Sequence, residues 1–458
     1  MYLLPGLSAH KNLLSAYLFF MSSFFILGYF TDYSKWKKFY LPSFVVVFTI
    51  ILILLTRAVF VAFLSFVLVS LFSAWYIKFK TKTKIKLEGW KNLVVAIGIS
   101  FALFITFYAS FSKTEYAAQQ ANPAGYMEST TANERFALWY YSAKMFIKYP
   151  IAGVGSGNWK MVLPEQSLKG VYRAQYENLV FLQPHNDYLW ILCELGIIGL
   201  LLYVIPLILI FNRAIKTLSE VNNAKQLTLL FLISTVAGWA TISIFDFPKE
   251  RTELILFSGT CLGLIYGFSK NETEKILFHI PWNIFRTGIT LFLILNIVIG
   301  LYRLSGEKHF MALSKYQKLN NLELVITEAK KAKKHFMQMD PFTSPFDLYI
   351  ARAHAARGRT DLAFESFENA LAINPNSYGC LNNFAGTLAK AGQYDKAIPL
   401  YLRAQSIYPD LEDGMFNISY TYTQTKQYDL AEEWVQKVKK NTTRKDAYLI
   451  KIEELRKR

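Results

Sequence analysis

The sequence predicts an all-α protein in two parts, a polytopic helical membrane domain over residues 1–303 and an α-solenoid over residues 304–458. Three observations predict this fold class. Hydrophobic residues make up 53% of the 458 residues, which is high for a soluble chain. These residues gather into stretches long enough to cross a bilayer as helices. Beyond residue 304 the sequence is charged, and it repeats with a fixed period.

The membrane domain is predicted from its apolar stretches, each of about 16 to 25 residues, the length that a spanning helix needs. They indicate eight spans, near residues 12–30, 40–56, 58–77, 93–111, 188–212, 226–245, 253–268 and 286–303. No basic segment precedes the first apolar run, so no cleavable signal peptide is predicted. The three cysteines imply neither a disulfide framework nor a zinc site.

The orientation follows from the basic loops, because short loops rich in Lys and Arg stay in the cytoplasm. Every second connection is basic: residues 31–39, 78–91, 213–225 and 269–286. The N-terminus, the long loop 112–187 and everything after residue 304 are therefore expected outside. Much of the net charge of +17 lies in these loops, which argues against a nucleic-acid partner. An external N-terminus without a signal is expected of a chain that lacks several earlier spans.

The solenoid is predicted from an internal repeat of 34 residues over 347–440. Gly358-Arg359-Thr360-Asp361-Leu362-Ala363 aligns with Gly392-Gln393-Tyr394-Asp395-Lys396-Ala397 and with Lys426-Gln427-Tyr428-Asp429-Leu430-Ala431. This period with its small and large landmarks is typical of tetratricopeptide repeats, which are pairs of antiparallel helices. Residues 305–340 are expected to form a preceding helical pair. Such arrays bind proteins on their concave face, or they brace a neighbouring domain, and the sequence leaves both roles open.

The outer loop 112–187 contains an amphipathic helix that begins near Asn133 and ends at Tyr149-Pro150. Its apolar positions follow helical spacing, and its aromatic residues suit a membrane interface. The segment from Ile151 to Trp159 follows, with glycines at 153, 155 and 157. It lacks the Lys-Ser/Thr ending of a phosphate-binding loop, so a tight turn between two interfacial helices is the predicted role.

Three polar residues on the outer side are candidates for chemistry. His185 lies where the outer loop enters the fifth apolar stretch, and neutral imidazole is the usual general base near pH 7. His10 is the other outer histidine near the membrane. Arg57 lies between two apolar stretches, where an unpaired charge is costly, and Arg135 lies on the same side. The two arginines could hold a pyrophosphate through their fixed donors. A structural histidine and an arginine that reaches lipid phosphates are the alternatives.

These segments resemble the O-antigen ligase and polymerase superfamily of bacterial membrane glycosyltransferases. The resemblance covers roughly residues 1–270. It lies in Gly6-Leu7-Ser8-Ala9-His10-Lys11-Asn12, Thr56-Arg57, Arg135 to Trp139, Pro150-Ile151-Ala152-Gly153-Val154-Gly155, Pro184-His185-Asn186-Asp187-Tyr188-Leu189 and Glu194-Leu195-Gly196-Ile197-Ile198-Gly199. Relatives often show Ser-Arg-Gly where this chain has Thr-Arg-Ala, and they carry more spans. Asp246 to Arg251 is similar to the subset of the family with C-terminal repeats.

The resemblance implies an inverting, metal-independent transfer of glycan from an undecaprenyl-pyrophosphate donor, without a cofactor, at the outer face of the bacterial inner membrane. His185 would accept the proton of the acceptor hydroxyl. Arg57, Arg135 and, as a third candidate, Arg251 would bind the donor pyrophosphate. Four further residues would support the site: Asn186, Glu194, Gly153 and Gly155.

The acceptor stays open at this stage. A lipid acceptor would make the protein an O-antigen ligase, a growing glycan would make it a polymerase, and a protein acceptor would make it an O-oligosaccharyltransferase. The non-enzymatic alternative is a membrane scaffold that recruits outer proteins through periplasmic repeats. A transporter is disfavoured because Glu194 is the clearest charged residue within a span.

Overall fold

The structure is a computed structural model that describes residues 11–32, 34–82, 85, 87–111, 130–166, 171, 180–221, 223–269, 281–335, 337–439 and 442–457. The chain forms two compact units. The first comprises Met1–Ser156 and Gln183–Lys275, and the second comprises Gly157–Leu182 and Ile276–Arg458. The elements of both units are α-helices and short 3-10 helices over the described ranges, which confirms the predicted all-α fold class.

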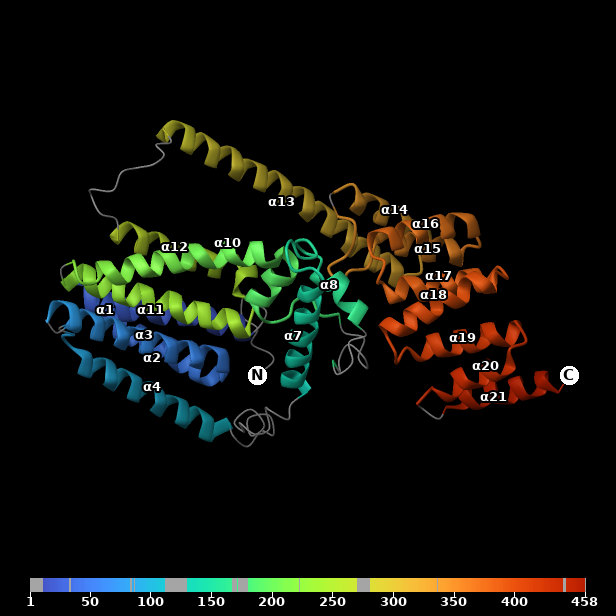
Figure 1. Ribbon diagram of the computed structural model, residues 1–458, viewed down its shortest axis with the longest axis horizontal. Helices are drawn as coiled ribbons and strands as arrows, with labels where there is room; N and C mark the ends of the chain where they lie inside the picture. The colour runs from blue at the N-terminus through green and yellow to red at the C-terminus, as the bar shows by residue number, and fades with distance from the viewer. Residues whose placement is uncertain are drawn as a thin grey trace. The chain divides into compact units, whose positions relative to one another are not determined.

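The first unit is a bundle of apolar helices (Figure 1). They are α1 (Lys11–Thr31), α2 (Lys37–Leu54), α3 (Arg57–Thr81), α4 (Trp90–Phe111), α10 (Asp187–Thr217), α11 (Asn223–Phe245) and α12 (Thr252–Phe268), joined by the outer-loop helix α7 (Thr130–Lys148). Among the described residues, seven helices are long and apolar enough to cross a membrane. Six of them belong to the first unit, and the seventh is α13 of the second unit. The seventh predicted span, near residues 253–268, corresponds to α12, a shorter apolar helix of 17 residues.

Helix α11 lies at the centre of this bundle, packed against α1, α3 and α12. Its approach to α3 is close because Gly238 has no side chain. A Cβ atom there would lie 2.2 Å from Cζ of Phe19 and 3.1 Å from the carbonyl oxygen of Ala62. One hydrogen bond, 2.8 Å between the hydroxyls of Ser70 and Ser234, also joins α3 to α11. The two helices run antiparallel, so the start of α3 lies level with the end of α11.

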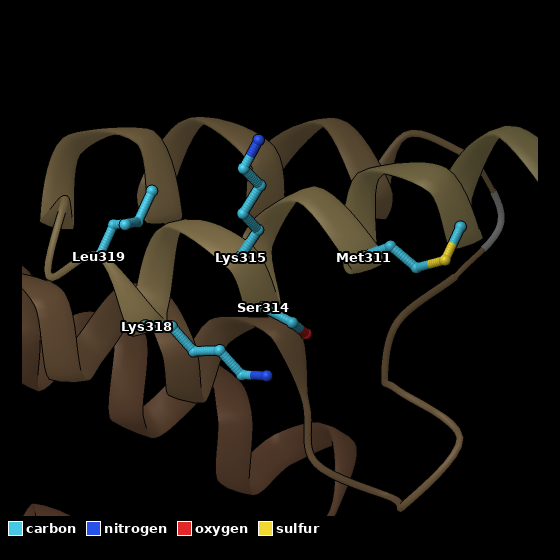
Figure 2. A pocket seen from close by; sticks show the side chains of 5 residues that line it. All are labelled: Met311, Ser314, Lys315, Lys318 and Leu319. Atoms are coloured by element: carbon cyan, nitrogen blue, oxygen red, sulfur yellow. The ribbon is translucent and has the colours of Figure 1, made fainter.

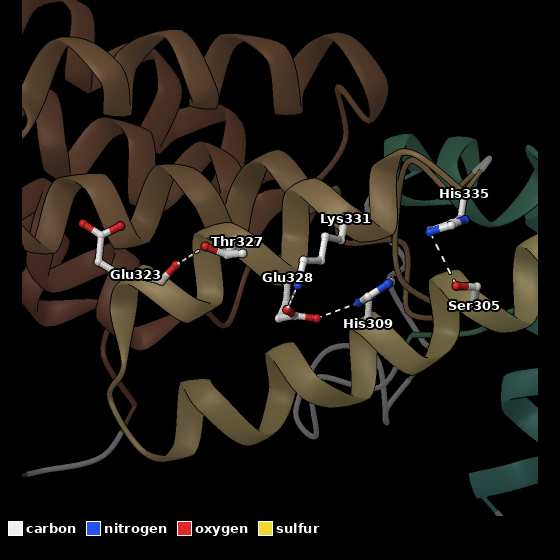
Figure 3. A network of polar contacts seen from close by, with 7 residues as sticks. All are labelled: Ser305, His309, Glu323, Thr327, Glu328, Lys331 and His335. Atoms are coloured by element: carbon white, nitrogen blue, oxygen red, sulfur yellow. Dashed lines mark hydrogen bonds and ion pairs between the residues drawn. The ribbon is translucent and has the colours of Figure 1, made fainter.

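The second unit contains the longest helix, α13 (Trp282–Lys318), which passes without a break from apolar to charged sequence. The predicted domain boundary at 303/304 lies inside this helix. Its C-terminal part pairs with α14 (Leu322–Lys333), as expected for the segment before the repeats. Figure 3 shows the polar contacts of this pair: Nδ1 of His309 lies 2.6 Å from Oε2 of Glu328, and Lys331 donates to Oε1 of Glu328 at 2.8 Å.

The repeats form antiparallel helix pairs, as predicted from the 34-residue period. The pairs are α15 (Phe346–Ala356) with α16 (Thr360–Ile373), α17 (Tyr378–Lys390) with α18 (Tyr394–Ile407), and α19 (Glu412–Gln424) with α20 (Tyr428–Gln436), followed by α21 (Thr443–Arg456). The small landmarks Ala363, Ala397 and Ala431 are fully buried, which lets the helices of each pair pack closely. Two short elements of the outer loop, α8 (Trp159–Val162) and η2 (Leu163–Gln166), belong to the same unit.

Candidate functional site

His185 is held in a strained loop immediately before α10. Its φ of 54° lies in the left-handed region, which non-glycine residues rarely adopt and which often marks functional positions. The loop is fixed on both sides of the histidine. Nε1 of Trp139, on α7, donates to the carbonyl of Pro184 at 2.9 Å. Oδ1 of Asn186 accepts from the backbone N–H of Leu189 at 3.0 Å and so caps α10.

The imidazole of His185 faces the turn that follows α11. Its Nδ1 lies 3.8 Å from Oδ1 of Asp246, and its side chain is 19% exposed whereas that of Asp246 is 2% exposed. Phe247 packs edge-on against the ring, with centroids 5.1 Å apart. The two side chains thus lie within ion-pair distance, an arrangement in which a carboxylate can orient a histidine ring. The sequence offered Asp246 only as part of the motif from Asp246 to Arg251.

Arg135 reaches the same turn from α7. Its Nη1 donates to the carbonyl of Phe245 at 3.1 Å, so the guanidinium sits at the C-terminal end of α11, next to Asp246. Its Nε is buried and makes no hydrogen bond to any residue that the structure describes. The structure therefore brings together Arg135 and His185, which are 50 residues apart in sequence.

Arg57 begins α3 at the same end of the bundle. The preceding residue, Thr56, shares a hydrogen bond of 2.6 Å with Ser15 of α1. Lys11 lies one turn before Ser15, close enough for its charge to repel that of Arg57. Helix register gives the level of Arg57. The contact between α3 and α11 is that of Ala62 with Gly238, and Arg57 lies five residues before Ala62. Because the helices run antiparallel, the residue of α11 at the same level lies five residues after Gly238, about 7.5 Å from the contact at 1.5 Å per residue. That residue is Ser243, in the last turn of α11.

Arg251 begins α12 and lies at the same level as Lys11. The ring centroids of Tyr17 on α1 and Phe257 on α12 lie 5.5 Å apart. Lys11 precedes Tyr17 by six residues, and Arg251 precedes Phe257 by six residues. Both therefore lie about 9 Å beyond that contact. Nε of Arg251 is buried and has no hydrogen-bond partner among the described residues. Helix register thus places Lys11, Arg57 and Arg251 at the end of the bundle where Arg135 and His185 lie, and the sequence had not identified Lys11 as a candidate site residue.

The glycine turn docks against a break in α10. Gly196 has φ 65° and ψ −166° inside that helix. The turn fills the gap with three backbone hydrogen bonds of 2.9 Å: Val154 N–H to Cys193, Gly155 N–H to Glu194, and Ile197 N–H to Pro150. Because two of the turn's amides bind helix carbonyls, the geometry favours a structural turn over a phosphate cradle. Gly153 and Gly155 both have positive φ, and Glu194 is a buried residue at this junction.

A second contact ties the turn after α11 to α10. Asp187 is fully buried, and its Oδ2 accepts from the backbone N–H of Lys249 at 3.1 Å. Nζ of Lys249 lies 3.3 Å from the ring centroid of Trp190, a cation–π arrangement. Burial lowers the pKa of Lys249, although the carboxylates of Asp187, Glu194 and Glu250 oppose the shift. The motif from Asp246 to Arg251 was the sequence signal for this contact.

Other polar groups do not form a second candidate. Among the described residues, no three His, Cys, Asp or Glu side chains are grouped as metal ligands would be. A surface hollow of about 430 Å³ lies along the C-terminal part of α13 (Figure 2), and none of the predicted site residues lines it. His10 and residues 112–129 of the outer loop lie outside the described residues.

Comparison with known proteins bears directly on this site. Residues 42–204 match the O-antigen ligase family. That segment contains His185, Arg57, Arg135 and every supporting residue of the predicted site, but not Arg251. Two tetratricopeptide-repeat families match residues 354–413 and 413–441. The predicted resemblance is thereby confirmed for both parts of the chain.

Individual relatives match over shorter stretches. A protein of Rickettsia prowazekii provisionally named a polysaccharide ligase is 32% identical over 113 residues, which is 24% of this chain and 26% of that protein. The corresponding protein of Rickettsia felis is 32% identical over 114 residues. The chain thus matches about a quarter of the length of these relatives. The crystal structure of MamA aligns over 39% of this chain and 97% of its own at 17% identity, with a TM-score of 0.27.

Proposed function

We propose that this protein transfers a glycan from an undecaprenyl-pyrophosphate donor to an acceptor hydroxyl at the outer face of the bacterial inner membrane. The observation that carries the proposal is the pairing of His185 with Asp246 beside Arg135, because His185 and Arg135 lie within the segment that matches the O-antigen ligase family. The basic connections after α1 and α3 follow the helix ends opposite to Lys11 and Arg57, so the distribution of positive charge supports an outward-facing site. The same distribution supports a periplasmic location of the repeats.

The residues have complementary roles in this reaction. His185 accepts the proton of the acceptor hydroxyl as that oxygen forms a bond to the anomeric carbon of the glycan. The bond from the anomeric carbon to the phosphate oxygen breaks, and the undecaprenyl pyrophosphate leaves with that electron pair. A single displacement inverts the configuration at the anomeric carbon. Asp246 stabilises the imidazolium that results.

The cations at this end of the bundle support the leaving group. Its charge grows as the glycosidic bond breaks, so donors aimed at the phosphate oxygens act most strongly in the transition state. Arg135 and Arg251 each present a buried Nε without a partner among the described residues. Arg57 and Lys11 add two charges from neighbouring helix ends. The set supplies the counter-charge for a pyrophosphate from side chains alone and is metal-independent.

Two substitutions test the mechanism. His185→Ala should lower glycan transfer by about 10²–10⁴-fold, the usual contribution of general base catalysis. Arg135→Ala should lower it by about 10²–10³-fold. Arg286→Ala is the control, because this exposed arginine lies in the first turns of α13, next to a connection predicted inside. All three variants should insert in the membrane at the wild-type level, and normal transfer by both site variants would refute the mechanism.

The surface glycan of a strain that lacks this protein identifies the acceptor. Lipid A-core without polymer indicates the ligase reaction, which we favour because the matching family is named for it. Single repeat units indicate a polymerase, and unmodified glycoproteins indicate an O-oligosaccharyltransferase. An unchanged surface glycan would leave the scaffold hypothesis, in which the repeats recruit proteins without catalysis.

A further inference from the structure

A short segment of the outer loop is bound to the repeat array within the second unit. Helices α8 and η2, residues 159–166, cluster with the repeats rather than with the membrane bundle, and η2 packs against α18 (Figure 1). Trp159 and Leu163 of this segment are almost completely buried. The segment thus occupies a surface of the array that a free-standing repeat domain would offer to other proteins.

One residue of the array makes the polar contacts to this segment. Asn376 lies in the turn between α16 and α17 and is 6% exposed. Its Nδ2 donates to the carbonyl of Met161 at 2.9 Å and to Oε1 of Glu165 at 3.0 Å. Its Oδ1 accepts from Nη2 of Arg403, on α18, at 3.5 Å. The whole amide is therefore committed to the loop segment and to the helix beside it.

Hydrogen bonds of Asn374 fix the turn that carries Asn376. Its backbone N–H donates to Oδ1 of Asn374 at 3.1 Å, and Nδ2 of Asn374 donates to the carbonyl of Thr343 at 2.9 Å. The equivalent position one repeat later, 34 residues on, is Asp410. That carboxylate pairs with Lys439 of the array itself, at 2.7 Å. The outward contact is thus specific to the turn at Asn376 and is not a general feature of the repeat.

The connectivity of the segment gives this contact a consequence. The segment begins four residues after Gly155, whose N–H is bound to the break in α10. Within four residues the outer loop therefore passes from a turn that is bound to α10 to a segment that is bound to the array.

We propose that residues 159–166 are an intramolecular ligand of the repeat array, held through Asn376. A protein that binds the surface formed by the α16–α17 turn and α18 must displace this segment. The array then serves as a reversible clamp on residues 159–166 as well as a binding domain. This inference concerns the loop and does not depend on the reaction proposed above.

Hydrogen–deuterium exchange on the full-length protein in nanodiscs tests the clamp. Asn376→Asp places a carboxylate against Glu165 and the carbonyl of Met161, and should speed exchange of residues 159–166 by about tenfold, the effect of losing two modest hydrogen bonds. Asp410→Asn is the matched control in the equivalent turn and should leave that exchange unchanged. Equal exchange of residues 159–166 in wild type and Asn376→Asp would overturn the proposal.

A second variant separates release of the loop from damage to the array. Glu165→Ala removes one contact from the loop side and leaves every array residue in place. It should speed exchange of residues 159–166 by several-fold, while exchange of α17 and α18 stays at the wild-type rate. Faster exchange in the array without faster exchange in the loop, or no effect of Glu165→Ala, would contradict the clamp.

Discussion

Gly196→Ala tests how the glycine turn supports the candidate site. The residue lies inside α10 with φ 65° and ψ −166°, a conformation that is essentially restricted to glycine. A Cβ atom there would lie 2.1 Å from the carbonyl oxygen of Ile151 and 2.7 Å from the backbone nitrogen of Ala152. Both obstacles are backbone atoms, so rotation of a side chain cannot relieve the overlap, and the turn must move away from the helix.

The size of the effect follows from what the turn would lose. The strained backbone costs an alanine about 1–3 kcal/mol. The three backbone hydrogen bonds between the turn and α10 contribute about 0.5–1.5 kcal/mol each. The sum is about 2.5–7.5 kcal/mol, a large fraction of the roughly 5–15 kcal/mol that stabilises a typical domain. We therefore expect the turn to detach and α10 to straighten, which would displace His185 at the start of that helix.

Thermal unfolding of the purified protein in detergent measures this effect, with glycan transfer as the second readout. The midpoint should fall by several degrees, and transfer should fall by at least tenfold. Gly263→Ala is the control, because a Cβ atom at that glycine of α12 meets nothing within 4 Å. Alanine is the better helix former, so the control should be neutral or slightly more stable. If Gly196→Ala behaves like Gly263→Ala in both assays, the reasoning is refuted.

Three further predictions concern single residues. Asp246→Asn should lower kcat for glycan transfer by about 10- to 100-fold with little change in KM, because the charge 3.8 Å from His185 stabilises the imidazolium; an unchanged kcat would exclude the pairing. Lys426→Gly should raise the stability of the array by about 1 kcal/mol in thermal unfolding, since Lys426 has φ 60° where the two preceding repeats have glycines. Burial raises the pKa of Glu328, but hydrogen bonds from Lys331 and His309 outweigh it, so the pKa lies below its ordinary value of 4.5. The unfolding free energy should therefore fall as the pH drops below about 4.5, and Glu328→Gln should flatten that dependence in an unfolding series at several pH values.

The pattern of apolar stretches and the 34-residue period were sufficient to predict the architecture. A spanning helix satisfies its own backbone groups and needs only length and apolar composition, so residue counts alone located the seven described helices that could span a membrane and the shorter apolar helix α12. The repeat landmarks predicted which positions are buried, and Phe367, Tyr401 and Val435 are buried as their spacing indicates. Only α12 is shorter than the length criterion for a spanning helix, because length at a helix end depends on the turn before it.

The sequence also nominated His185, Arg57 and Arg135 from residue type and position, because an ionisable group at a membrane boundary needs a reason to be there. The sequence did not identify Asp246 and Lys11 as site residues. A carboxylate beside a proline turn and a lysine before an apolar run are common in proteins and indicate no particular role. Their roles arise from partners that lie 61 and 46 residues away in sequence, His185 and Arg57. Such pairings depend on helix register, which no local pattern encodes.

What the sequence determined by itself is therefore the set of apolar helices, their order along the chain and the helix pairs of the array. Local composition and periodicity fix these because each helix satisfies its own hydrogen bonds. Only the tertiary structure decided that the glycine turn fills the break at Gly196, that Asp246 faces His185, and that residues 159–166 bind the array through Asn376. Each of these contacts joins segments that are distant in sequence, so close packing, and not propensity, selects them.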